Sequence, residues 1–309
     1  MSLRIGHLST FYHTSILMTA ANTMGPETEW KLFGTGPAIV HAFEKAEIDL
    51  AYIGLPPAII GIDRGVDIKC VAGGHVEGTV ISGGGQFRGF PEIPALNEIL
   101  TQFTGLKIGV PGRGSIHDVI ISEMLRRYGL DNDIQIINFK WADEILEAIY
   151  KGEVSAAVGT PALAVAIKHF AGGKILCPPS KIWPYNPSYG IVVHNAFLDK
   201  NRETVMGFLI RHEEASASLR DDPAGAAKII SGHVGIVDQD YVLDVLNVSP
   251  RYCACLSDEY ISATMEFVRT LHELGYIKRP ISSGEIFDKS LIDAVHPERD
   301  HYGDTVSLP

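Results

Sequence analysis

The sequence predicts an α/β protein made of two Rossmann-like lobes with the same order of strands and helices. Short apolar strands alternate with amphipathic helical segments, which is typical of parallel βαβ units. The segments 4–21 and 107–125 share one pattern of strand, polar loop and helix. The segments 46–59 and 152–165 share a second pattern, a strand ending at glycine and a proline-bearing turn into a helix. The repeated order indicates two similar lobes.

Composition is consistent with two lobes and excludes some partners. The chain has 309 residues, of which 46% are hydrophobic, enough for about two domains with apolar cores. Its net charge is −11, and no basic cluster is longer than Arg126-Arg127, so we expect no nucleic-acid partner. A small anion is still a possible ligand, because a few local N–H groups can hold one whatever the net charge.

The cysteines predict neither a disulfide framework nor a metal site. The chain has four, Cys70, Cys177, Cys253 and Cys255. Cys253-Ala-Cys255 is too close for an easy disulfide and lacks the second pair that a zinc site needs. We expect ordinary thiols and no cofactor.

The sequence leaves the cellular location open. No apolar run reaches the length of a membrane span, and no signal peptide precedes the first predicted strand. Either the protein stays in the cytoplasm, or a leader was removed and it is extracytoplasmic, periplasmic or anchored to a membrane. We expect a monomer.

The chain is expected to cross between the lobes twice. We assign residues 1–84 and 191–309 to lobe one and residues 85–190 to lobe two. The glycine-rich segment 82–85 is the first predicted crossing, and the strand 189–193 is the return. Two crossings form a double hinge. From Asn195 onward the pattern is mostly helical, and these helices are expected to complete lobe one. The last long helix opens with a capping signal and ends at Gly275.

The segment GLKIGVPGRGS, residues 105–115, predicts a strand, a tight glycine loop and a helix capped by Ser115. Such a loop directs free N–H groups and the positive end of a helix dipole at one point. It lacks the Lys-Ser/Thr pair of a phosphate-binding P-loop and the third glycine of a dinucleotide loop. Two interpretations remain. The loop either holds one compact polar or anionic group near Ser115 and Ile116, or it is an ordinary turn with a capped helix. Arg113 in this loop could pair with a carboxylate or sulfonate.

The corresponding loop of lobe one is STFYHTS, residues 9–15. Its hydroxyl groups can donate and accept hydrogen bonds, its aromatic rings can cover a ligand, and His13 can donate. The alternative is a surface turn with one aromatic side chain in the core. Ligands of open α/β sheets bind beyond the carboxyl ends of the strands. The loops 6–14, 54–58, 109–118 and 159–162 are therefore expected to line one cleft.

The predicted cleft carries histidines but no catalytic set. His13, His75 and His117 fall on cleft-side loops, yet no HxH or HxxxH pair and few carboxylates accompany them. We therefore expect hydrogen bonds to an anionic ligand rather than a metal. No GxSxG elbow occurs, and Ser115 and His117 should point apart at a helix start. We predict no catalytic residue.

Several segments resemble the solute-binding proteins of ABC importers for nitrate, sulfonates, taurine, bicarbonate and thiamine-pyrimidine precursors. The resemblance covers nearly the whole chain and is carried by GLKIGVPGRGS, EIDLAYIGLPPAI, SLRDDPAGAAKIISGHVGI and LHELGYIKRPISSGEIFDKSLIDAV. It implies a type II periplasmic-binding-protein fold, whose lobes close on the ligand like a hinge. It also implies a small-molecule solute and a membrane permease as partners.

The resemblance, together with the loop analysis, gives a set of candidate ligand-binding residues. The loops of lobe one contribute Ser9, Thr10, Phe11, His13, Gly54, Leu55, His75 and Thr79. Lobe two and the return strand contribute Gly114, Ser115, Ile116, His117, Thr160 and Tyr189.

Two other functions remain open. A cytoplasmic enzyme of cofactor biosynthesis on the same fold would use closure to exclude water. The lack of a leader favours that enzyme, and the lack of a base–nucleophile set disfavours it. A ligand sensor is the third reading, but regulators of this fold usually carry a helix-turn-helix, for which there is no room before Arg4.

Overall fold

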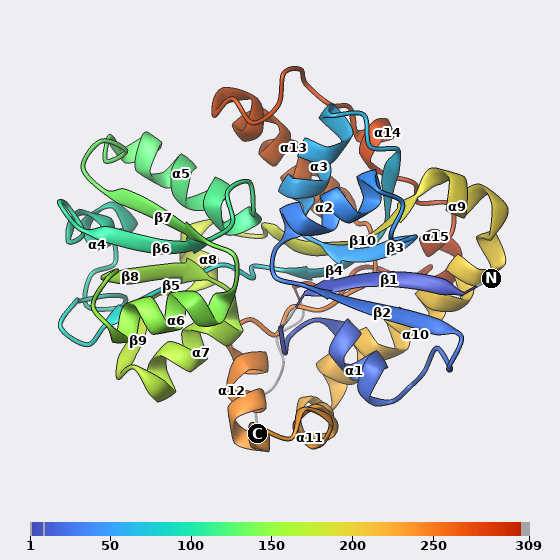
Figure 1. The fold of residues 1–309 in the computed structure, drawn as a ribbon, viewed down its shortest axis with the longest axis horizontal. Coiled ribbons are helices and arrows are strands. Elements are labelled where there is room, and N and C mark those ends of the chain that lie inside the picture. Colours follow the sequence, from blue (N-terminus) through green and yellow to red (C-terminus); the bar gives the residue numbers. More distant parts are fainter. Residues whose placement is uncertain (1, 9, 304–309) are drawn as a thin grey trace.

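Two sheets, each flanked by helices, make up the protein (Figure 1). The computed structural model describes residues 2–8 and 10–303, and each sheet has five strands in that part of the chain. We call the first sheet with its helices lobe one, on the right of Figure 1, and the second sheet with its helices lobe two, on the left. The mixed α/β class predicted from the sequence is confirmed.

The sheet of lobe one has the strand order β2-β1-β3-β10-β4. Its strands are β1 (Leu3–Leu8), β2 (Thr28–Phe33), β3 (Leu50–Ile53), β4 (Ile68–Val76) and β10 (Pro187–His194). β1 pairs in parallel with β2 and β3, as expected for βαβ units. β10 is antiparallel to both its neighbours, β3 and β4.

The sheet of lobe two repeats this arrangement in the order β7-β6-β8-β5-β9. Its strands are β5 (Val80–Gly84), β6 (Lys107–Pro111), β7 (Gln135–Phe139), β8 (Ala156–Gly159) and β9 (Gly173–Cys177). β6 is parallel to β7 and β8, and β5 is antiparallel to β8 and β9. Each sheet thus has four strands that run in one direction and one antiparallel strand in the fourth position, which agrees with the repeated order in the sequence.

The crossings between the sheets differ from those expected. The segment 82–85 was predicted to be the first crossing, but Ser82 and Gly83 pair with β8 and β9 inside the second sheet. The chain therefore leaves the first sheet between Val76 and Val80. A glycine fits at position 83 of this strand because a Cβ there would lie only 2.8 Å from the Leu176 side chain. The strand 189–193 is also not a crossing, because all of β10 belongs to the first sheet.

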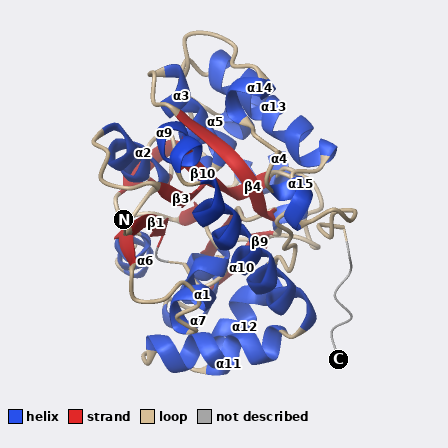
Figure 2. Ribbon diagram, turned by 90° about the vertical axis from the view of Figure 1, so that its right-hand side faces the viewer, coloured by secondary structure: helices blue, strands red, loops and turns tan. Residues whose placement is uncertain are grey.

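The helices occupy both faces of the sheets, as the side view shows (Figure 2). Those of lobe one are α1 (Thr14–Ala20), α2 (Gly36–Glu44), α3 (Leu55–Asp63), α9 (Asn195–Lys200), α10 (Arg202–Asp221), α11 (Pro223–Val234), α12 (Gln239–Val248), α13 (Asp258–Glu273), α14 (Ser283–Ile286) and α15 (Ile292–Val295). Those of lobe two are α4 (Leu96–Thr101), α5 (Ile116–Tyr128), α6 (Ala142–Tyr150), α7 (Pro161–Phe170) and α8 (Pro179–Ile182). No helix within the described residues is both long and apolar enough to span a membrane.

The C-terminal helices follow the sequence signals. The Ser257 side chain accepts a hydrogen bond from the Tyr260 N–H at the start of α13, which is the predicted cap. The helix runs to Glu273, and Gly275 takes the left-handed conformation just after it, with φ +73°. α12 was expected to complete lobe one. It also packs on α7 of lobe two, where the Tyr241 hydroxyl donates to the Ala162 carbonyl at 3.4 Å.

The two lobes are in contact along their facing edges. Tyr276 follows α13 in lobe one. Its hydroxyl donates a hydrogen bond to Asp118 Oδ2 of lobe two at 2.6 Å. Lys168 Nζ of α7 lies 3.0 Å from Asp244 Oδ2 of α12. Most buried apolar side chains of both sheets also form one cluster that spans the lobes, and a second, smaller cluster of Ile145, Ala157, Leu163 and Ile167 lies within lobe two. The structure therefore shows the lobes closed on each other.

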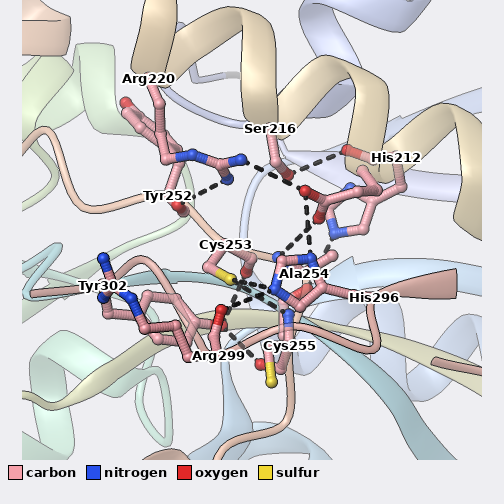
Figure 3. A network of polar contacts seen from close by, with 12 residues as sticks. His212, Ser216, Arg220, Tyr252, Cys253, Ala254, Cys255, His296, Arg299 and Tyr302 are labelled. Atoms are coloured by element: carbon pink, nitrogen blue, oxygen red, sulfur yellow. Dashed lines mark hydrogen bonds and ion pairs between the residues drawn. The ribbon is translucent and has the colours of Figure 1, made fainter. Parts of the chain in front are cut away.

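A buried polar network fastens the C-terminal segment to lobe one (Figure 3). His296 Nδ1 lies 3.3 Å from Glu213 Oε1, and Arg220 approaches the same carboxylate at 3.3 Å. The Tyr302 hydroxyl donates to the Cys253 carbonyl at 2.7 Å. Contacts with Cys253 and Glu213 raise the pKa of His296 to about 10, so this histidine is protonated at neutral pH. All four cysteines are free thiols.

Candidate functional site

A cavity of about 50 Å³ lies between the lobes, where loops from both sheets meet. Its size suits a small solute rather than a peptide. Lobe one lines it with Leu8, Thr10, Tyr12, His13, Gly34, Thr35, Gly36, Gly54, Pro57 and Ser188. Lobe two lines it with Pro111, Ser115, Ile116, His117, Ala142 and Thr160. The cavity thus lies beyond the carboxyl ends of parallel strands, as expected for open α/β sheets.

Helices α2, α3, α5, α6 and α7 all begin at this cavity. Each contributes its N-cap residue or its first helical residue to the lining. The first N–H groups of a helix have no partner within the helix, and they carry the positive end of its dipole. Prolines near the starts of α2, α3 and α7 remove some of these N–H donors. The first turn of α5 contains no proline, so it keeps all of its N–H donors. The cavity is therefore a place where backbone donors converge.

The glycine loop of lobe two is held in a fixed shape. The Ser115 hydroxyl caps α5 by accepting from the Asp118 N–H at 3.3 Å, and it donates to the Pro111 carbonyl at the same distance. The Gly114 N–H donates to Asp118 Oδ2 at 2.7 Å, and Gly114 has φ +82°, where a side chain would be strained. These bonds leave the N–H groups of Ile116 and His117, the first two residues of α5, without a partner in their own helix.

The first loop of lobe one has polar atoms with no partner. Thr10 Oγ1 and His13 Nδ1 are buried and make no hydrogen bond to any residue that the structure describes. Only 6% of Thr10 and 1% of His13 are exposed. A buried polar atom left unpaired costs about 1–3 kcal/mol, and such atoms are rare. Because both residues line the cavity, a bound solute is the natural partner for them.

The histidines of the cavity are neutral. Burial, followed by the neighbouring His75, holds the pKa of His13 well below its usual value. Burial lowers the pKa of His117 to about 3. Among the described residues, no Lys, Arg, Asp or Glu lines the cavity. Its electrostatic character therefore comes from helix ends and hydroxyl groups rather than from charged side chains.

The structure brings about half of the predicted site residues together. Seven of them line the cavity: Thr10, His13, Gly54, Ser115, Ile116, His117 and Thr160. Thr79 and Tyr189 do not line the cavity but lie next to it. Thr79 Oγ1 lies 3.0 Å from His117 Nδ1, and the Tyr189 hydroxyl accepts from the Thr14 N–H at 3.3 Å. Ser9 lies outside the described residues.

The other predicted residues lie elsewhere. Phe11 packs edge-on against Tyr241, with ring centroids 5.9 Å apart. Leu55 is fully buried in the core. His75 Nε2 lies 2.6 Å from the Ser249 carbonyl oxygen. Gly114 lines a neighbouring cavity together with Arg113, whose guanidinium lies 5.8 Å from the centre of the Tyr276 ring.

Several lining residues were not predicted. Thr35 and Gly36 follow β2 and begin α2, so the rule for strand ends that found the other loops applies to them as well. Ser188 lies in the antiparallel strand β10, and its hydroxyl is 3.1 Å from the Tyr12 hydroxyl. No sequence motif marks a residue of that kind.

No group of three or more His, Cys, Asp or Glu side chains within residues 2–8 and 10–303 is placed to hold a metal ion.

A family model and several solved structures match the chain. The model of the NMT1-like family matches residues 1–232. The alkanesulfonate-binding protein SsuA of Xanthomonas axonopodis pv. citri, bound to MOPS, matches with a TM-score of 0.78 and 17% identity, over 94% of this chain and 98% of that one. No curated protein sequence matches the chain.

Two further structures have the same fold. The ligand-binding component of an ABC-type import system from Staphylococcus aureus, with zinc bound, has a TM-score of 0.79 and 17% identity, over 96% of this chain and 100% of that one. The periplasmic nitrate-binding protein NrtA of Synechocystis PCC 6803 has a TM-score of 0.76 and 14% identity, over 95% and 88%. The fold implied by the sequence resemblance, that of the periplasmic binding proteins, is confirmed.

Proposed function

Because the chain belongs to the NMT1-like family, we propose that it is a solute-binding protein that captures a small polar or anionic solute between its lobes for an ABC importer. The observation that carries this proposal is the cavity between the lobes, with buried polar atoms that lack a protein partner. Solute and closure then stabilise each other, because each lobe supplies part of the contacts.

The fold neighbours support this proposal. They include proteins named for binding alkanesulfonate and nitrate, and a ligand-binding component of an import system. By the same likeness we propose an extracytoplasmic location and a membrane permease as partner. The monomeric state expected from the sequence stays a prediction. The permease would meet the closed form, in which both lobes present one joint surface.

The cavity chemistry supports binding rather than catalysis. The Ser115 hydroxyl is engaged with the Pro111 carbonyl, and His117 Nδ1 is engaged with Thr79. Among the described lining residues, no hydroxyl group lies within hydrogen-bonding distance of a histidine, because the hydroxyl that meets His117 is that of Thr79, which lies behind the lining. An enzyme of cofactor biosynthesis on this fold is therefore not favoured.

The experiment that tests the proposed function is a thermal-shift screen against small anions, sulfonates, pyrimidines and dicarboxylates. A solute that binds the native state raises the melting temperature by mass action. We expect one chemical class to give a large shift and to be recovered unchanged after incubation. Chemical conversion of the bound compound would instead identify an enzyme.

A further inference from the structure

Cys253 belongs to a buried cluster of a thiol, a histidine and a carboxylate that lies away from the cavity between the lobes (Figure 3). We propose that Cys253 is an oxidation site for hydrogen peroxide, and that His296 supplies the proton for this reaction. The oxidation goes beyond solute binding and does not depend on it, because neither residue lines the cavity.

The first observation is the arrangement around the Cys253 sulfur. His296 Nε2 lies 3.7 Å from Sγ, and the Cys255 N–H donates to the same sulfur at 3.4 Å. On the other side of the imidazole ring, His296 Nδ1 lies 3.3 Å from Glu213 Oε1. The carboxylate orients the ring, which is protonated at neutral pH. A cation beside a cysteine favours the thiolate, which is the form that attacks an oxidant.

The second observation separates Cys253 from the other three cysteines. Burial raises the pKa values of Cys70, Cys177 and Cys255 to about 12, so these side chains keep their protons at neutral pH. Cys255 is more exposed than Cys253, which is fully buried. Exposure alone would therefore make Cys255 the site of oxidation, whereas the histidine and the carboxylate favour Cys253.

The third observation concerns the segment that packs on Cys253. Residues 297–301 form no helix or strand, and residues 297–299 are exposed. Side chains hold this segment in place, since the Tyr302 hydroxyl donates to the Cys253 carbonyl at 2.7 Å and to the Cys255 carbonyl at 2.9 Å. A segment without regular structure opens locally at a small cost in free energy, and peroxide is small enough to enter through a brief opening.

The reaction needs peroxide as its only added reactant. The Cys253 sulfur attacks one oxygen of peroxide, the O–O bond breaks and an S–O bond forms. The departing oxygen takes a proton from His296 Nε2 and leaves as water. The sulfur is oxidised by two electrons to a sulfenic acid, and peroxide is reduced. The imidazole is then neutral and loses its ion pair with Glu213, and the added oxygen must be accommodated in a fully buried site. Oxidation should therefore release residues 297–302 from Cys253.

Peptide mass spectrometry with dimedone, which labels sulfenic acids, tests the site. The full chain would be treated with hydrogen peroxide in its native state, and the label would be quantified at each cysteine. We expect the label at Cys253 to exceed that at any other cysteine by about tenfold or more. Equal or greater labelling of Cys255, or no label at Cys253, would overturn the proposal.

Variants test the role of His296. His296→Gln keeps a side chain that can form hydrogen bonds but removes the cation, so we expect labelling of Cys253 to slow by about tenfold or more. If His296 only held the segment in place, this variant would loosen the segment and labelling would become faster. Tyr302→Phe removes two hydrogen bonds of the segment without changing the thiol or the imidazole, and it is expected to speed labelling. His41→Gln, at an exposed histidine of α2, is the control and should leave the rate unchanged.

Limited proteolysis tests the release of the segment. Cleavage by trypsin after Arg299 is expected to become faster once Cys253 is oxidised, and reduction of the sulfenic acid with dithiothreitol should restore the original rate. An unchanged rate of cleavage in the oxidised protein would show that oxidation does not release the segment. Solute binding is measured separately, so a failure of this proposal leaves the proposed function standing.

Discussion

Gly34 of lobe one packs directly against residues of lobe two. A Cβ at this residue would stand 2.4 Å from the Lys140 carbonyl oxygen and 2.9 Å from the Trp141 ring. Distances this short do not occur between real Cβ atoms and their neighbours, so any side chain here would push the lobes apart. Both Gly34 and the adjacent start of α6 line the cavity. The glycine is therefore required for closure rather than for the fold of lobe one.

Replacing this glycine tests the requirement. We expect Gly34→Ala to weaken solute binding by about tenfold or more, because part of the binding energy must be spent on a strained closed state. The melting temperature without solute should change little. Titration calorimetry with the best compound of the screen measures the effect. Gly85→Ala is the control, since its Cβ would meet only the Gly172 carbonyl at 3.6 Å. Equal affinity for both variants would contradict this role.

Single residues show how far the sequence predicts the site. Ser115, Ile116 and His117 line the cavity, where the sequence pattern places them, because a strand, a glycine loop and a capped helix are local features that fix where the helix begins. The same reasoning named Phe11, which instead packs on Tyr241 of α12. That contact joins residues far apart in the chain, so no local pattern could reveal it.

The loop that precedes α5 is tied to lobe one through Tyr276. The Tyr276 hydroxyl reaches Asp118 Oδ2 at 2.6 Å, and the same oxygen accepts from the Gly114 N–H at 2.7 Å. Asn138 Nδ2 donates to the other carboxylate oxygen at 2.9 Å. One buried carboxylate thus links the cross-lobe contact to the loop that lines the cavity.

Removing this hydroxyl should weaken closure and binding together. A hydrogen bond to a charged group contributes about 1.5–3 kcal/mol, so we expect Tyr276→Phe to lower solute affinity by about tenfold or more. The ring and its stacking on Arg113 remain, so the fold should persist. Calorimetry checks the affinity, and Tyr150→Phe, at a side chain that is 77% exposed, is the control. An unchanged affinity in Tyr276→Phe would rule out the link.

The C-terminal segment should release at alkaline pH. The pKa of His296 is raised to about 10 by Cys253 and Glu213, whereas in the unfolded chain it is about 6.5. A raised pKa stabilises the fold fully below about pH 6.5, and this contribution is lost as the pH rises to about 10. The free energy of unfolding, from urea titrations, should fall by at most about 1.4 kcal/mol per pH unit in that range.

His296→Gln is expected to flatten this fall, whereas His41→Gln, at an exposed histidine on α2, should not. A wild-type stability that stays constant from pH 7 to pH 9 would show that the network carries no such charge.

The positions of the strands along the chain were predicted more reliably than the pairing of strands within each sheet. The alternation of strands and helices and the repeated segments gave both sheets their central parallel strands, because hydrophobic periodicity is local. The segment 82–85 was assigned to a crossing because glycines suit turns, but it pairs with β8 and β9 instead. Strand pairing depends on residues far away in the chain, which the pattern of one segment does not contain.

At the scale of the whole molecule, we propose that the two lobes hold a solute between them. The contacts across the cleft, Tyr276 with Asp118 and Lys168 with Asp244, lie outside the cavity, and the lining itself keeps unpaired donors. Under the proposed function, the closed form leaves part of its hydrogen bonding to the solute. Separation of the lobes would expose those buried atoms to bulk water.

Small-angle X-ray scattering tests this claim most directly. The protein would be measured alone and with a saturating amount of the compound that gives the largest thermal shift. We predict a larger radius of gyration for the protein alone, and a scattering curve with solute that agrees with the closed structure described here. Identical curves under both conditions, with the solute bound, would contradict capture by closure of the two lobes.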